Sequence, residues 1–308
     1  MQTSFTRLVG CRHPLQLAGM GAVGSVELAS AVTAAGGLGT AGVAGLPADL
    51  VATLLDQAAR PLAANFLTPF LDPAAVEAAA SRVRVVEFFY GDPDGSLVDL
   101  VHAGGALASW QVGSLEEARR AADAGCDYLT AQGTEAGGHV RGKQPLPQLL
   151  AEVLQAVSVP VVAAGGIATA QQVAGLLADG AAGVRVGTRF LVCPEADVHP
   201  AYVEALLAAD GDDTVLTEAF GVGWPDAPHR VLRDSAERAR AGSSDVVGTL
   251  QMGPVQVPVP RLSTLPPTRT AEGDVAAMAM YAGIGVGHVT RVQSVAEVVD
   301  DLMREVSG

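Results

Sequence analysis

Cysteine is scarce in this sequence. The chain of 308 residues has three cysteines, Cys11, Cys126 and Cys193, which lie far apart and form no Cys-x-x-Cys pair. An odd, widely spaced set does not provide a disulfide framework. We therefore expect reduced thiols, two of them in the core, and no metal site.

Positive charge and long apolar runs are also scarce. The chain has 19 Lys and Arg against 33 Asp and Glu, a net charge of −14 and a pI near 4.7. This balance argues against nucleic acid or an anionic membrane surface as a partner, although a local site can still bind a small anion. No run approaches the ~18 apolar residues of a membrane span, and MQTSFTRLVGCRHPLQ lacks the apolar region of a signal peptide. We expect a cytoplasmic protein and leave open a homodimer.

Apolar residues and glycine are abundant. Hydrophobic residues make up 49% and charged residues 17%, with 36 glycines, which allows a large core and many tight turns. Ala-rich helical stretches follow the capping residues Ser25, Ser114 and Thr169, and Glu117 stands in the capping-box position.

Short apolar segments alternate with these helical stretches about eight times, which is typical of parallel strands joined by crossover helices. The segments lack polar alternation, so we expect strands buried on both faces. Eight units predict an α/β fold, a (β/α)8 TIM barrel; an open doubly wound sheet is the alternative. The expected strands are residues 15–19, 38–42, 62–66, 85–89, 106–112, 128–133, 159–166 and 183–190.

The alternation ends near residue 208. Residues 209–274 are rich in turn residues, with a helical stretch at 231–241 and five prolines in 253–268. We expect a barrel over 1–208, a lid or cap segment over 209–274 inserted after strand eight, and a helical segment over 275–308 that completes the barrel. The alternative for the insertion is a long connector.

Two glycine-rich stretches end strands seven and eight. Gly165, Gly166 and Gly187 allow backbone N–H groups to approach an anion, and Thr188 adds a hydroxyl donor. Barrels often bind phosphate at these two loops. Tight βα turns are the alternative for either stretch alone, whereas the two together indicate a phosphate site.

Other predicted strands also end in small or polar residues. Met20 follows the first strand, and the amides Asn65, Gln111 and Gln132 end the third, fifth and sixth. One amide would be an ordinary buried polar group. Three amides at one rim indicate side chains that hydrogen-bond to the edge of a flat heterocycle.

The stretch AQGTEAGGHV, residues 131–140, contains a histidine beside two glycines. Gly137 and Gly138 let the loop run close to a ligand and hold His139 toward it. A histidine suits proton transfer near neutral pH. For the other histidines we expect structural roles: His13, His102, His199 (ordering the chain after strand eight), His229 and His288. Trp224 and His229 would line the lid.

These stretches together resemble the nitronate monooxygenases, once called 2-nitropropane dioxygenases, which are FMN-dependent (β/α)8 barrels. The similarity is carried by HPLQLAGMG, AANF, QGTEAGGH, AAGGI, GTRF and YAGIGVG, and it covers most of residues 1–208 and part of the C-terminal end. It implies a catalytic His139 and FMN phosphate on Gly166, Gly187 and Thr188. The cofactor-binding residues that it implies are Met20, Asn65, Gln111, Gln132, Gly137, Gly138, Gly165, Gly166, Arg185, Gly187 and Thr188. Three departures concern the flavin and substrate contacts: Gln16 is shifted toward Pro14, and Arg185 and Ile284 stand where the family often has Gln.

The resemblance implies oxidation of alkyl nitronates, and of nitroalkanes, by O2 to carbonyl compounds and nitrite. Flavin enoyl-acyl-carrier-protein reductase and NAD(P)H:quinone reductase activities are alternatives on the same barrel, although VVEFFYG favours the monooxygenase. A flavin-free barrel that binds a phosphorylated metabolite is a further alternative, and a scaffold without a ligand is the least favoured.

Overall fold

The computed structural model describes residues 1–253 and 255–306, and its central feature is an eight-stranded parallel sheet. The strand order is β1-β9-β8-β6-β5-β4-β3-β2, and an isolated parallel bridge between Gln16 and Leu38 joins the first strand to the last. The predicted (β/α)8 barrel is therefore confirmed. Its strands are β1 (Leu15–Leu17), β2 (Gly39–Gly42), β3 (Leu62–Leu67), β4 (Val85–Phe89), β5 (Leu107–Val112), β6 (Tyr128–Gln132), β8 (Val161–Ala164) and β9 (Gly183–Val186).

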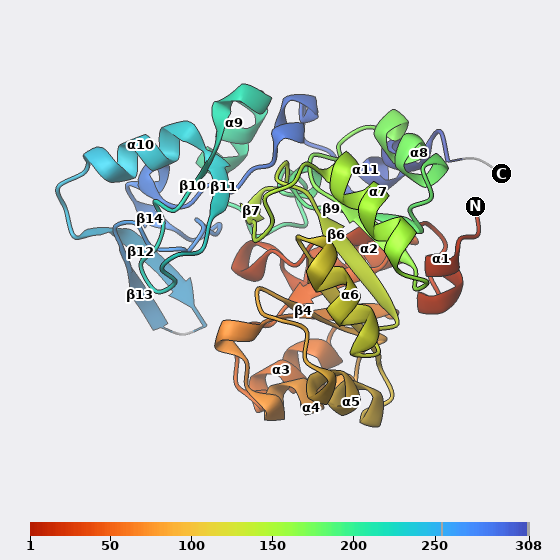
Figure 1. Ribbon diagram of the computed structural model, residues 1–308. Helices are drawn as coiled ribbons and strands as arrows, with labels where there is room; N and C mark the ends of the chain where they lie inside the picture. Colours follow the sequence, from red (N-terminus) through yellow and green to blue (C-terminus); the bar gives the residue numbers. More distant parts are fainter. Residues whose placement is uncertain (254, 307–308) are drawn as a thin grey trace.

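Helices follow the strands and cover the outside of the barrel (Figure 1). They are α2 (Val26–Ala34), α3 (Ala48–Asp56), α4 (Pro73–Ala80), α5 (Gly95–Ala103), α6 (Leu115–Asp123), α7 (Leu146–Ala156) and α8 (Ala170–Ala178). Ser25, Ser114 and Thr169 cap α2, α6 and α8 as predicted. The capping box is complete at Thr169, whereas the Glu117 carboxylate accepts from the Gly113 N–H instead.

Several predicted boundaries were wrong. The strands expected over 15–19 and 159–166 are shorter, Leu15–Leu17 and Val161–Ala164. The strand expected over 183–190 ends at Val186, because the chain turns at Gly187 into a 3-10 turn, Thr188–Phe190. The helix expected over 231–241 begins at Arg233, because His229–Leu232 pairs on both sides as a strand. Sheet pairing therefore overrides local helical preference at residues 231–232.

A short helix that the sequence did not predict, α1 (Ser4–Val9), closes the N-terminal end of the barrel. Phe5 and Val9 pack with residues from the strand starts, including Val85 and Val162. Phe5 meets the ring of Tyr128 edge-on, with centroids 5.4 Å apart. This apolar cluster seals one end of the barrel, so a ligand can enter only from the other.

The chain after β9 builds a lobe beside the barrel and then returns (Figure 1, left). After α9 (Pro200–Ala208) it forms β10 (Thr214–Thr217), β11 (His229–Leu232), α10 (Arg233–Ala241), β12 (Val246–Met252), β13 (Val255–Pro260) and β14 (Glu272–Gly273). The last helix, α11 (Val295–Met303), packs against α2 and α8 on the barrel. In the described part of the chain, no helix has the length and apolarity needed to cross a membrane.

Replacing Phe5 with Ala should destabilise the barrel, because the ring is fully buried in the end cluster. We expect a loss of about 3–5 kcal/mol in the free energy of unfolding, measured by urea denaturation. Phe70→Ala is the control, because Phe70 is 40% exposed, and should cost less than about 1 kcal/mol. Equal losses would contradict the role of the end cluster.

Candidate active site

A cavity of about 560 Å³ lies at the C-terminal ends of the barrel strands. Its volume is in the range of cofactor and ligand pockets. All twelve residues predicted for the site line it: Met20, Asn65, Gln111, Gln132, Gly137, Gly138, His139, Gly165, Gly166, Arg185, Gly187 and Thr188. The barrel thus brings together residues that are up to 168 positions apart in the sequence.

The turns after β8 and β9 leave backbone donors at the cavity wall. Gly165 and Gly166 have positive φ, +120° and +68°, and a Cβ at Gly166 would lie 3.0 Å from the Cβ of Glu135. Within the described residues, no hydrogen bond uses the N–H groups of Gly166, Ile167, Gly187 and Thr188. Unpaired N–H groups that converge on one space are a site for an anion.

The segment 281–285 completes this wall. The Gly283 N–H donates to Thr188 Oγ1 at 3.1 Å, and the Ile284 N–H donates to the Glu135 carbonyl at 3.0 Å. A Cβ at Gly137 would lie 2.5 Å from the Gly283 nitrogen, so the two backbones touch. The sequence did not predict Gly283 and Gly285 as lining residues, although YAGIGVG was among the stretches that carried the family resemblance.

A two-residue strand holds His139 over the cavity. β7 (Gly138–His139) pairs antiparallel with β11, with His139 opposite His229. The Val140 N–H donates to the Pro228 carbonyl at 2.8 Å, and Gln132 Nε2 donates to the His139 carbonyl at 3.1 Å. The lobe and the barrel therefore fix the His139 backbone from two sides.

Aromatic rings surround the His139 side chain. Trp224 stacks on the imidazole with centroids 4.0 Å apart and 25° between the planes. Tyr90 and Tyr281 approach to 5.9 Å and 5.8 Å between centroids. His139 Nε2 is buried and has no hydrogen-bond partner among the described residues. An unpaired buried ring nitrogen at a cavity indicates a ligand contact.

The surroundings keep this imidazole neutral. Burial, and to a smaller extent His229, lower the pKa of His139 from 6.5 to about 3. Burial also lowers the pKa of His229, whose Nδ1 donates to the Ala227 carbonyl while Nε2 accepts from the Phe220 N–H. His229 thus uses both ring nitrogens within the protein, whereas His139 keeps Nε2 for a ligand.

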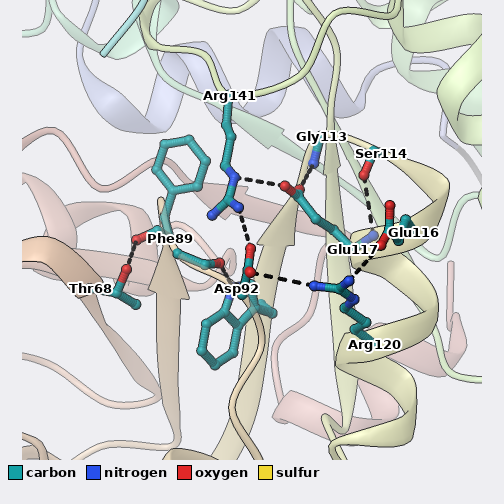
Figure 2. Close-up of polar contacts among 11 residues, drawn as sticks. Thr68, Phe89, Asp92, Gly113, Ser114, Glu116, Glu117, Arg120 and Arg141 are labelled. Atoms are coloured by element: carbon teal, nitrogen blue, oxygen red, sulfur yellow. Dashed lines mark hydrogen bonds and ion pairs between the residues drawn. The ribbon is translucent and has the colours of Figure 1, made fainter. Parts of the chain in front are cut away.

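Ion pairs anchor the chain that follows His139 (Figure 2). Arg141 pairs with Glu117 on α6, at 2.7 Å, and with Asp92 after β4. Asp92 also pairs with Arg120 at 3.4 Å. Figure 2 shows Asp92 and Arg141, from the segments after β4 and β7, meeting Glu117 and Arg120 on helix α6.

A buried ion pair lies at the floor of the cavity, with Arg185 in the cavity wall and Glu87 beneath it. The Glu87 carboxylate, which is fully buried, pairs with Arg185 and accepts from Asn65 Nδ2 at 2.7 Å. Arg185 Nη1 also donates to Gln111 Oε1 at 2.8 Å. The sequence placed Asn65, Gln111 and Arg185 at the site, but Glu87, which connects them, was missed because it lies inside an apolar strand.

Several residues that the sequence analysis discussed lie outside the cavity wall. The three cysteines are free, and burial raises the pKa of each thiol to about 12, so they are protonated at pH 7. His199 caps α9 by accepting from the Ala201 N–H at 3.0 Å, which agrees with the ordering role expected for it. Of the two residues expected to line the lid, Trp224 lines the cavity, whereas His229 is fully buried and does not.

The model of the family described as nitronate monooxygenase matches residues 68–305. The chain belongs to the nitronate monooxygenase family. The family consists of oxidoreductases. The part of the chain that matches the family model includes His139, the turns after β8 and β9, and the 281–285 segment.

Relatives and one solved structure extend the comparison. A nitronate monooxygenase of Pseudomonas aeruginosa is 30% identical over 77% of this chain and 82% of its own length. A (3aS,4S,5R,7aS)-5-hydroxy-7a-methyl-1-oxo-octahydro-1H-indene-4-carboxyl-CoA dehydrogenase of Mycobacterium tuberculosis is 35% identical over 79% of this chain and 70% of its own length. The structure of FabK from Thermotoga maritima superposes with a TM-score of 0.81 at 29% identity, covering 99% of this chain and 96% of FabK.

Nitronate monooxygenases are in general flavin-dependent, and the cavity residues fit a flavin nucleotide. The unpaired N–H groups after β8 and β9 suit a phosphate. Gln132 Oε1 is buried without a partner in the described part of the chain and lines the same cavity. An amide acceptor there matches a donor on a heterocycle.

Gly137→Ala should abolish binding of a flavin in this cavity, because a Cβ would lie 2.5–2.6 Å from the backbone of residues 282–283 and displace them. Reconstitution with FMN, followed by absorbance after gel filtration, measures the effect. Gly175→Ala is the control, since that helical position has nothing within 4 Å of the added Cβ. Full FMN binding by the Gly137 variant would contradict this account of the wall.

The lowered pKa of His139 predicts an acid-sensitive fold. Its folded pKa of about 3 lies below the ordinary 6.5, so the unfolded chain binds more protons and stability falls as pH drops from about 6.5 toward 3. His139→Asn should therefore lose less unfolding free energy between pH 7 and pH 5 than wild type, by on the order of 1 kcal/mol. Urea denaturation at both pH values tests this, and equal losses would contradict it.

Proposed function

We propose that this protein uses FMN and O2 to oxidise alkyl nitronates to carbonyl compounds and nitrite. The observation that carries the proposal is the neutral imidazole of His139, whose unpaired Nε2 lies at a cavity that suits a flavin. Membership in the nitronate monooxygenase family and the Pseudomonas aeruginosa relative support it.

The residues that would hold FMN come from every side of the cavity. The N–H groups of Gly166, Ile167, Gly187 and Thr188 would bind the phosphate, and the amides Asn65, Gln111 and Gln132 would meet the ring and the ribityl chain. When bound, FMN supplies the electron-accepting chemistry that no side chain provides. The protein supplies position, electrostatics and exclusion of water.

His139 favours a substrate that is already an anion. A base whose conjugate acid has a pKa of about 3 removes a carbon proton poorly at pH 7. A nitronate has already lost that proton and needs only a hydrogen bond to orient its oxygens. We therefore assign His139 as the residue that orients the nitronate, with proton abstraction from neutral nitroalkanes as its weaker role.

The lobe restricts water at this position. Trp224 and Leu265, both within residues 209–274, line the cavity, and Trp224 covers one face of the imidazole. Residues 209–274 accordingly act as a cap over the barrel mouth, which strengthens the hydrogen bonds beneath it.

Oxidation or reduction of an acyl thioester is the second candidate. The coenzyme A ester dehydrogenase relative suggests it, and apolar side chains such as Leu54 and Phe70 also line the cavity. An apolar acyl group would suit these side chains. The substrate series in the test below separates the two candidates.

The first test is the absorbance spectrum of the purified protein, followed by anaerobic mixing with propionate 3-nitronate and, separately, with NADPH. We expect bound FMN that the nitronate bleaches and NADPH does not. Rapid bleaching by NADPH, followed by turnover of an enoyl thioester, would favour the second candidate. A colourless protein that takes up no FMN would overturn both.

His139→Asn should bind FMN as wild type does and lose at least tenfold in kcat/KM for the nitronate, because an orienting hydrogen bond is removed at the reacting end. The loss with a neutral nitroalkane should be as large or larger. His199→Asn is a matched control, since His199 caps α9 away from the cavity. Full activity of the His139 variant on both substrates would exclude the assigned roles.

A further inference from the structure

An ion pair spans the barrel lumen directly below the cavity. Arg185 lies on β9 and Glu87 on β4, and these strands are four positions apart in either direction around the eight-stranded order. The two side chains therefore meet from opposite walls. A pair with side-chain exposures of 4% and 0% is costly unless further hydrogen bonds satisfy it.

The pair is oriented with its positive end toward the ligand space. Arg185 lines the cavity and Glu87 does not. Protein donors surround the carboxylate instead: Asn65 Nδ2 at 2.7 Å, Gln16 Nε2 at 3.3 Å and Thr130 Oγ1 at 3.4 Å. The negative charge is thus held below the floor while the guanidinium forms part of it.

Part of the guanidinium remains available. Its contacts with Glu87 and Gln111 both use Nη1. Among the described residues, Nη2 and Nε of Arg185 have no hydrogen-bond partner. A guanidinium offers five N–H donors in a fixed plane, so unused donors remain on a residue of the cavity wall.

We propose that Arg185 binds the polar edge of the flavin ring and stabilises the negative charge that the ring gains on reduction, and that Glu87 sets the strength of this effect. This inference rests on the proposed FMN site. Arg185 is thereby a residue that tunes the electron affinity of the cofactor, and Glu87 is a positioning residue that partly compensates its charge. The pair should raise the electron affinity of the flavin, because its positive charge lies nearer the cavity than its negative charge.

The test compares Arg185→Gln with Glu87→Gln after FMN reconstitution. Each protein is equilibrated anaerobically at pH 7 with a reductant and a reference dye, and the ratio of reduced to oxidised FMN is read at a fixed dye ratio. We expect Arg185→Gln to lower this ratio about tenfold, which is about 30 mV for a two-electron couple. Glu87→Gln should raise it severalfold, because the guanidinium loses its compensating charge.

Opposite shifts are the decisive result, since a merely structural pair would move both variants in the same direction. The double variant should give a ratio of reduced to oxidised FMN between those of the two single variants. Arg189→Gln, a buried arginine that does not line the cavity, is the control and should leave the ratio unchanged. If Arg185→Gln fails to fold, Arg185→Lys with an unchanged ratio and Glu87→Gln with a raised one support the proposal.

Two failures are distinguishable. Shifts in the same direction, or ratios within twofold of wild type in FMN-loaded variants, would overturn this inference and leave the proposed function standing. A wild-type protein that takes up no FMN would overturn the proposed function and this inference with it.

Discussion

The contact between the loop after β6 and the segment 282–284 is the constraint on which the site depends. Gly137 and Gly283 approach so closely that neither position has room for a Cβ. The contact is reinforced by the hydrogen bond from the Ile284 N–H to the Glu135 carbonyl. On one side it leads to His139, and on the other, through Gly283 and Thr188, to the wall of unpaired N–H groups. A single backbone contact thus sets the distance between the anion site and the imidazole.

The lumen of this barrel is polar where many barrels are packed with branched apolar residues. Gln16, Thr130 and Glu87 lie at its centre, with Tyr128 donating to Gln16 Oε1 at 3.2 Å. The apolar cluster around Phe5 lies beneath them. The polar layer lends little to stability, because buried charges cost desolvation energy even when paired. It gives the cavity a rigid floor of fixed dipoles and charges, a suitable base for a ligand with a polar ring.

Periodicity and capping predicted the barrel well, because each strand–helix unit is encoded locally. Ser25 and Thr169 begin their helices where the sequence indicates. Glycines at strand ends were also informative, since Gly165 and Gly166 adopt backbone angles that other residues avoid. Glu87 was not predictable in this way, because its partner Arg185 is 98 residues distant. The pairing of β7 with β11 was equally hidden, because two residues carry no periodic signal and only the folded lobe brings β11 beside them.

The same pairing limits how the molecule can open. His139 is a member of the sheet β10-β11-β7, whose other two strands belong to the lobe. A lobe that swung away from the barrel would carry the imidazole with it or break the ladder. If the lobe opened in this way, ligands would enter while the histidine was displaced, and His139 would be in place over the cavity only in the arrangement that the structure shows. Loosening of the β7–β11 ladder would thus uncover the cavity and displace the imidazole in one event, so the lobe and the histidine form a single unit.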